Sequence, residues 1–173
     1  MADDFEKAIL ICFNVTGAVD ASLMEQATAF LRSFRASPEA LRASIERFTV
    51  TSFWEVKFFC IQTLHEIATS PSRLTKDDRD LLRAATERFL ARDCLITGAG
   101  ALPPYLRAKV AQLTVAILRE EYPGGGWPSF FADLAALLPK GGAAAADMVI
   151  KVLVSIDEDL APSDSRAAAA AAA

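Results

Sequence analysis

Residues 121–134 read EYPGGGWPSFFADL, and this stretch decides how the rest of the chain is interpreted. Three glycines lie between two prolines, and aromatic residues follow at once. A passage of this kind could be a loop that holds a ligand, an aromatic pocket or a tight corner between two helices. We predict the corner, because proline ends or begins a helix and glycine turns without steric cost.

In this interpretation Pro123 ends one helix and Pro128 occupies the first position of the next. Trp127 packs against the corner and fixes the angle between the two helices. Three apolar side chains of the second helix then face the core of the domain: Phe130, Phe131 and Leu134.

The other segments also repeat apolar residues at helical spacing, and no convincing alternating strand is present. One further helix is expected to begin after Asp20, and another carries Leu106, Val110, Leu113 and Ile117 and ends near Tyr122. The remaining six are expected over residues 3–14, 38–48, 54–69, 75–92, 128–138 and 143–159.

Start signals support several of these helices. Asp20 and Thr75 are expected N-caps, and Ser37-Pro38-Glu39 combines an N-cap, a proline and an acid in the order typical of a helix start. The helix after Asp20 carries five apolar residues on one side: Leu23, Ala27, Phe30, Leu31 and Phe34.

The helices alternate between broadly apolar ones and more charged partners joined by short turns. Lys57 and Lys109 occupy similar places in two of them, at a separation slightly above that of HEAT-type repeats. A compact bundle is the alternative, but an apolar band this wide needs neighbours on more than one side. We therefore predict an all-α solenoid of HEAT-like antiparallel helix pairs over residues 1–160, with a disordered alanine-rich tail at residues 161–173.

The composition excludes several classes of protein. The chain has 173 residues, 53% of them hydrophobic, and a net charge of −4. It can therefore bury a core, and it has no overall electrostatic attraction to nucleic acid or anionic lipid. Cys12, Cys60 and Cys94 are odd in number and far apart, which favours free thiols. Neither a signal peptide nor a membrane span is apparent, and we expect no membrane insertion.

The residues that could carry chemistry do not combine into a site. Cys60 and His65 lie five positions apart, so their side chains diverge on a helix, and no second histidine is available for a metal. The side chains of adjacent acids such as Asp77 and Asp78 diverge as well. Acids in the first turn of a helix are also stabilised by the helix dipole, so they need no functional explanation. The glycine runs lack the dinucleotide and phosphate-loop patterns. We expect no catalytic residue, no cofactor and no metal.

A stripe of arginines recurs along the helix at 75–92. Acidic residues between the arginines reduce the net positive charge, and no aromatic side chains alternate with them for base stacking. Contact with an acidic protein partner is therefore favoured over direct binding of nucleic acid. The stripe consists of Arg79, Arg83, Arg88 and Arg92.

The stretch at residues 106–138, LRAKVAQLTVAILREEYPGGGWPSFFADLAALL, resembles the hallmark of the importin-β/exportin superfamily. There a helix of the type R-x-K-x-A-Q-x-x-A ends in E-x-P and W-x-x-F-F-x-D-L-L follows. VKFFCIQTLHEI at 56–67, TGAVDASLMEQATAFL at 16–31 and DMVIKVLVSIDEDL at 147–160 are most similar to the tRNA-exportin (exportin-T) family in its plant and algal form. Ala108 stands where the family usually has asparagine, and PGGG lengthens the turn.

This resemblance implies a nuclear export receptor that binds the GTPase Ran in its GTP form, carries tRNA, meets nuclear pore proteins and shuttles between nucleus and cytoplasm. In the superfamily, Ran is held by the second helices of the N-terminal repeats. Those helices are expected here at residues 38–48, 75–92 and 128–138. Their outward polar residues are the expected Ran contacts: Arg42, Glu46, Arg83, Glu87 and Asp133.

The resemblance also implies that the chain is an N-terminal fragment of a longer solenoid, so most of the tRNA-binding surface would lie elsewhere. Two alternatives stay open. The chain could be a helical scaffold for another protein, or a transport receptor of the same superfamily for protein cargo.

Overall fold

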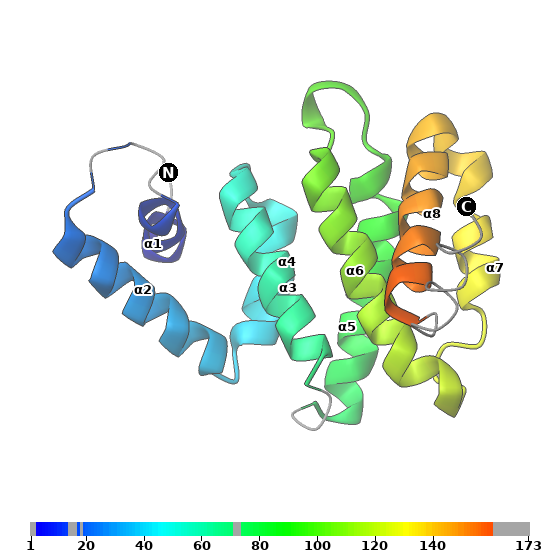
Figure 1. Ribbon diagram of the computed structural model, residues 1–173, viewed down its shortest axis with the longest axis horizontal. Coiled ribbons are helices and arrows are strands. Elements are labelled where there is room, and N and C mark those ends of the chain that lie inside the picture. The colour runs from blue at the N-terminus through cyan, green and yellow to red at the C-terminus, as the bar shows by residue number, and fades with distance from the viewer. Residues whose placement is uncertain (1–2, 14–16, 18, 71–73, 161–173) are drawn as a thin grey trace, which may run out of the picture. The chain divides into compact units, whose positions relative to one another are not determined.

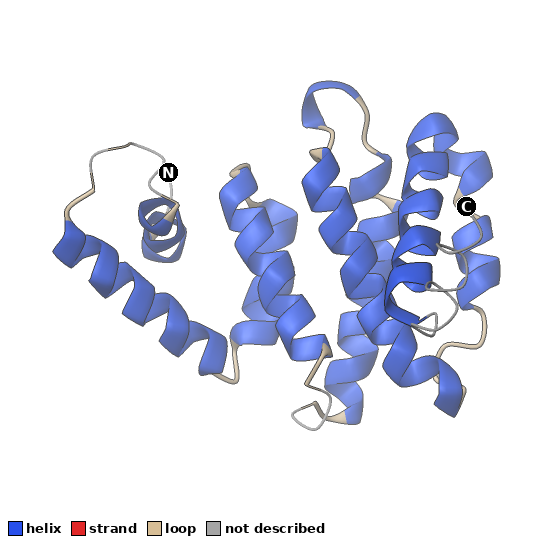
Figure 2. Cartoon of the chain, in the orientation of Figure 1, coloured by secondary structure: helices blue, strands red, loops and turns tan. Residues whose placement is uncertain are grey.

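The computed structural model of the chain describes residues 3–13, 17, 19–70 and 74–160. The regular structure of these residues consists of eight α-helices and three short 3-10 helices, without a strand (Figures 1 and 2). The prediction of an all-α fold is confirmed, and the succession of helices is consistent with a helical-repeat solenoid. The chain forms two compact units, Met1–Leu82 and Arg83–Ala173.

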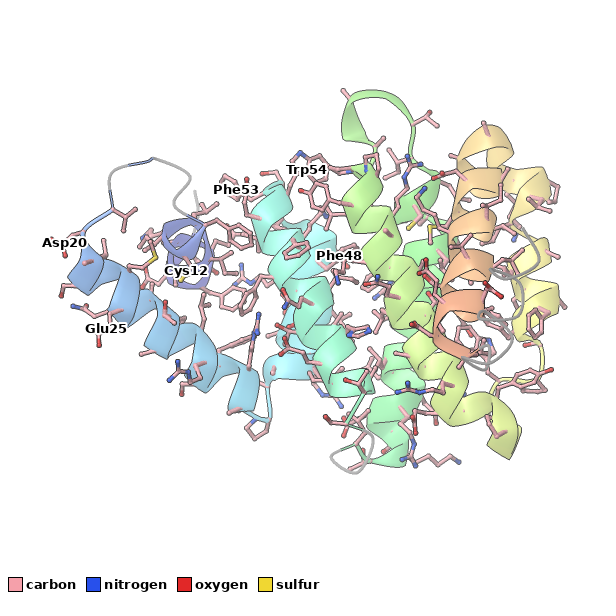
Figure 3. The ribbon with its side chains drawn as sticks, viewed as in Figure 1. Cys12, Asp20, Glu25, Phe48, Phe53 and Trp54 are labelled. Carbon is pink, nitrogen blue, oxygen red and sulfur yellow. The ribbon has the colours of Figure 1, made fainter. Side chains whose placement is uncertain are left out.

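Unit 1 begins with two helices whose N-caps are aspartates. Asp3 accepts a hydrogen bond from the Glu6 amide at 2.9 Å, and Asp20 accepts one from the Ser22 amide at 2.7 Å. Asp20 lies at the first turn of its helix in Figure 3, as the sequence predicts. Unit 1 contains α1 (Asp4–Cys12), α2 (Ala21–Ala36), α3 (Ala40–Val50), α4 (Trp54–Ala68) and the first part of α5 (Lys76–Ala91).

The core of unit 1 forms where α1 and α3 pack against α4. Phe48, Cys60 and Leu64 are fully buried there. Lys57 is 8% exposed, and its ammonium donates to the backbone carbonyl of Phe48 while lying 4.8 Å from the centre of the Phe48 ring. A buried lysine is tolerated here because the end of α3 supplies a carbonyl acceptor for its charge.

Thr75 is the N-cap of α5, as predicted. Its hydroxyl accepts from the Asp78 amide at 3.2 Å, and the Asp78 carboxylate accepts from the Thr75 hydroxyl at 2.7 Å and from the Thr75 amide at 3.3 Å. This reciprocal pattern is a capping box, and it satisfies backbone donors that the first turn would otherwise leave without partners.

Unit 2 is built around α6. This helix buries nine residues, among them Leu106, Val110 and Leu113, and packs against α8. All four residues predicted for its apolar face are buried. Unit 2 contains the rest of α5, the 3-10 helices η2 (Asp93–Leu95), η3 (Gly98–Gly100) and η4 (Tyr122–Gly124), and α6 (Pro104–Glu121), α7 (Phe130–Ala135) and α8 (Leu138–Leu160).

The structure corrects two predicted helix starts. Ser37 does not cap α3; the chain makes a turn at Ser37–Glu39, and the Ala40 amide binds the Ser37 carbonyl at 3.3 Å. Pro128 likewise lies in a turn, and α7 begins at Phe130 and ends at Ala135. In both places proline forms a turn that precedes the helix, and the helix starts two residues later than predicted.

The last helix is interrupted close to the predicted start. Gly142 lies inside α8 with φ 53° and ψ −129°, a conformation that side chains other than glycine's rarely adopt. The predicted helix at 143–159 therefore corresponds to the part of α8 after Gly142. The predicted tail, residues 161–173, lies outside the described residues.

Candidate partner-binding surface

The stretch at 121–134 is a helix corner, as predicted. Gly125 adopts a left-handed conformation with φ 70°, and the Gly126 amide binds the Glu121 carbonyl at 2.9 Å. A β-carbon on Gly126 would lie 3.3 Å from that carbonyl oxygen, which leaves little room for any other residue. The glycines therefore serve the turn, and a phosphate loop is not needed to explain them.

Arg83 stabilises this corner through two hydrogen bonds. Its Nη1 donates to Glu121 Oε2 at 2.8 Å and to the Gly126 carbonyl at 2.6 Å. The Glu121 side chain is only 9% exposed, so it depends on this cation for charge neutralisation. Arg83, one of the predicted Ran contacts, therefore also has partners within the chain.

The aromatic residues of the corner divide into two groups. Trp127 and Phe130 are 3% and 1% exposed, with ring centres 4.9 Å apart. Phe131 is 49% exposed and lies 5.8 Å from the Tyr122 ring, so the prediction that it faces the core is wrong. Successive residues of a helix point about 100° apart, and α7 has room in the core for only one of the two phenylalanines.

The five predicted contact residues fall into the two units. Arg42 and Glu46 are exposed on α3 in unit 1, and Arg42 lies 3.9 Å from Asp78. The hydrogen bonds from Thr75 lower the pKa of Asp78, and Arg42 contributes in the same direction. Arg83, Glu87 and Asp133 belong to unit 2.

Unit 2 brings Glu87 and Asp133 together at the edge of a groove of about 240 Å³ between α5 and α7. Partial burial raises the pKa of Glu87, and the Asp133 and Glu121 carboxylates raise it further against the opposing effect of Arg83. Glu87 and Asp133 therefore place two negative charges close together at this groove.

Three arginines of the stripe have partners within the chain: Arg79 and Arg83 of α5, and Arg92, which follows that helix. Besides Arg83, Arg79 donates to the Leu74 carbonyl at 3.3 Å and Arg92 lies 3.2 Å from Asp93. Guanidinium groups held in this way are poor candidates for phosphate contacts. That α5 is not a direct nucleic-acid surface stays a prediction.

Cys60 cannot act as a nucleophile in this environment. It is completely buried, and burial raises its pKa from 9.0 to about 12, so the thiol stays protonated at neutral pH. Across the described residues, no three His, Cys, Asp or Glu side chains lie close enough to hold a metal ion.

A charged cluster in unit 2 was not predicted. Arg107 of α6 lies 3.2 Å from Asp147 of α8, and Lys151 donates to the same carboxylate at 2.6 Å. Asp93 and Cys94 are buried nearby, and burial raises the pKa of Cys94 to about 12, with Asp93 as the next cause. These residues are up to 58 positions apart in the chain, and their spacing carries no signal that could have joined them.

None of the described helices combines the length and apolar character that a membrane crossing requires.

Similarity to known proteins decides the family. Residues 103–172 match the family model described as exportin 1-like protein. Exportin-T of Arabidopsis thaliana is 31% identical over 91% of the chain, that of Dictyostelium discoideum 32% over 94%, and that of Oryza sativa subsp. japonica 34% over 94%. The chain belongs to the exportin-T family.

The chain spans 14–16% of the length of these exportin-T relatives. The family model covers α6, α7 and α8, which include the corner that first indicated the superfamily. The relatives are exportins and the family model describes exportin-like proteins, which are transport receptors. The prediction that the chain is not an enzyme is confirmed.

Proposed function

We propose that the chain acts in a nuclear export receptor for tRNA, as the N-terminal part that binds Ran in its GTP form. One observation carries the proposal: identity of 31–34% to three exportin-T proteins over more than nine-tenths of the chain. The receptor moves between nucleus and cytoplasm and contacts nuclear pore proteins on the way. Residues 1–160 form the repeat region in this proposal, and residues 161–173 a tail.

Arg42, Glu46, Arg83, Glu87 and Asp133 are the proposed contacts with Ran. Arg83 is partly exposed and the other four are exposed on α3, α5 or α7, so a partner can reach each of them without any change in the core. Arg83 also supports the contacts of unit 2, because it holds the corner from which α7 begins.

The arrangement of charge favours a protein partner for this part of the family. Arginines of α5 are used inside the chain, and the groove of unit 2 carries carboxylates, which repel phosphate. We therefore assign the tRNA surface mostly to parts of the family's length beyond this chain. A receptor for protein cargo, the second candidate, shares this acidic surface.

Retention of Ran on the immobilised chain tests the proposal. Ran loaded with a non-hydrolysable GTP analogue should be retained and Ran-GDP should not. The triple variant Glu46→Gln, Glu87→Gln, Asp133→Asn should lose retention, while the matched variant Glu158→Gln, which removes an exposed acid of α8, should keep it. Equal retention of the two nucleotide forms, or of neither, contradicts the proposal.

Labelled tRNA separates the two kinds of receptor. On the complete receptor with Ran-GTP, an excess of unlabelled tRNA should displace the label and protein cargo should not. Displacement by protein cargo would favour the second candidate.

A further inference from the structure

The groove of unit 2 has an apolar floor and an acidic rim. Its floor is formed by side chains that are at most 5% exposed: Leu90, Trp127, Phe130, Leu134 and Leu137. Glu87 of α5 and Asp133 of α7 stand at the rim, and both are exposed. Lys140 of α8 is a third charged residue of the lining.

The size of the groove restricts what it can hold. At about 240 Å³ it is smaller than the roughly 300–1,000 Å³ of pockets that enclose drug-sized molecules. One long side chain fits such a space better than a cofactor. Carboxylates at the rim exclude phosphate groups, and they also disfavour a purely apolar side chain, which would cover charges without pairing them.

The charges of the groove are incompletely balanced. Asp133 accepts from the Ser129 hydroxyl at 2.6 Å, but among the described residues no ion pair joins Lys140 to Glu87 or to Asp133. The pKa of Glu87 is raised chiefly by partial burial, and the Asp133 and Glu121 carboxylates add to the effect of burial. Arg83 opposes this effect, but it is bound to Glu121 and Gly126. A second cation at the rim would therefore be stabilised.

We propose that this groove binds a lysine or arginine side chain of a protein partner, with its aliphatic stem on the apolar floor and its cation between Glu87 and Asp133. Long cationic side chains combine these two properties, because their methylene stems cover apolar surface while the charged end stays near water. The identity of the partner rests on the proposed function, since Glu87 and Asp133 also belong to the surface assigned to Ran. The chemistry of the groove can be tested without Ran.

Trp127 supplies the reporter for this test. Its indole N–H is buried against the groove and has no acceptor among the described residues, so its NMR resonance should respond to an occupant. Trp54 lies in unit 1 and serves as the control in the same spectrum. The probe is the tripeptide amide acetyl-Gly-Lys-Gly-NH2, compared with its norleucine and glutamate counterparts at matched ionic strength.

The lysine peptide should shift the Trp127 indole signal in a saturable way and leave that of Trp54 in place. Glu87→Gln with Asp133→Asn should weaken its apparent affinity roughly fivefold or more, from the loss of two exposed charge pairs. Lys140→Gln should strengthen it, because it removes a competing cation, and Glu158→Gln should have no effect. Opposite signs at Lys140 and Glu87 distinguish a cation site from a general loss of structure.

An equal response to the norleucine peptide, or no saturable shift of Trp127 with the lysine peptide, overturns the inference. If the lysine peptide binds as expected but Ran-GTP is not retained by the chain, the groove stands and the proposed function fails. If Ran-GTP is retained and the peptide gives no shift, the proposed function stands and this groove is not the place of a basic side chain.

Discussion

Helices α2 and α6 differ in burial although both show an apolar stripe in the sequence. α2 buries Ala27 and Leu31 and leaves Leu23 and Phe30 nearly half exposed, whereas α6 buries nine residues. Within unit 1, α2 has its main contacts with α1, while α6 packs against both α8 and η4 within unit 2. Periodicity thus defines which residues share a face, and the number of neighbours decides whether that face is buried.

The largest expected contrast is between two phenylalanines. Phe130→Ala should lower the free energy of unfolding by about 3–5 kcal/mol, because it leaves a cavity beside Trp127. Phe30→Ala in α2 should cost less than about 1 kcal/mol, since that ring is 48% exposed. Urea denaturation of both variants measures the contrast, and similar losses would show that the two helices do not differ as described.

The exposed neighbour Phe131 sharpens the same test. Phe131→Ala should resemble Phe30→Ala, because its ring contacts Tyr122 at the surface. A loss as large as that of Phe130→Ala would restore the original prediction that both rings face the core.

Most of the fold could be predicted from the sequence because helix signals are local. Asp20 and Thr75 cap their helices as expected, and the apolar face of α6 is correct at all four predicted positions. Errors arise where tertiary packing decides between adjacent residues, as for Phe130 and Phe131, or where a turn competes with a helix start, as at Ser37–Glu39. The groove joins residues from α5 and α7, and only the folded chain brings those together.

The two buried thiols should make stability fall at alkaline pH. Burial raises the pKa of Cys60 and of Cys94 from 9.0 to about 12, so above pH 9 the unfolded chain loses protons that the folded chain keeps. The stability that each thiol contributes is complete below pH 9 and should decline by about 1.4 kcal/mol per pH unit up to about 12.

Denaturation between pH 8 and 11 measures this decline as the difference between the parent chain and Cys60→Ala or Cys94→Ala. An identical pH dependence in parent and variants would contradict the burial of these thiols. In the native chain at neutral pH, an alkylating reagent should modify the partly exposed Cys12 before either of them.

A smaller contrast concerns two ion pairs. Arg83→Gln should destabilise unit 2 by about 1.5–3 kcal/mol, because Glu121 is 9% exposed and loses its charged donor. Lys7→Gln should change stability by less than about 0.5 kcal/mol, since Lys7 and Asp4 of α1 are both exposed. If Glu121→Gln rescues Arg83→Gln, the cost comes from the unpaired carboxylate, and absence of rescue would assign it to the turn.

The smallest expected effect is that of Glu87→Gln. The pKa of Glu87 is raised above 4.5, so its ionised form destabilises the folded chain at neutral pH. Because the residue is largely exposed, the melting temperature should rise only slightly, and the gain should vanish as the pH falls below 4.5. A lower melting temperature at pH 7 would contradict the crowding of carboxylates at the groove.

The central proposal is that the chain binds Ran in its GTP form through acidic residues of unit 2. Fluorescence anisotropy of Ran carrying a labelled, non-hydrolysable GTP analogue or labelled GDP gives the two dissociation constants with the full chain. We predict binding at least about tenfold tighter for the GTP form, weakened by Glu87→Gln with Asp133→Asn and unchanged by Glu158→Gln. Equal affinity for the two forms, or binding of neither, would contradict the claim.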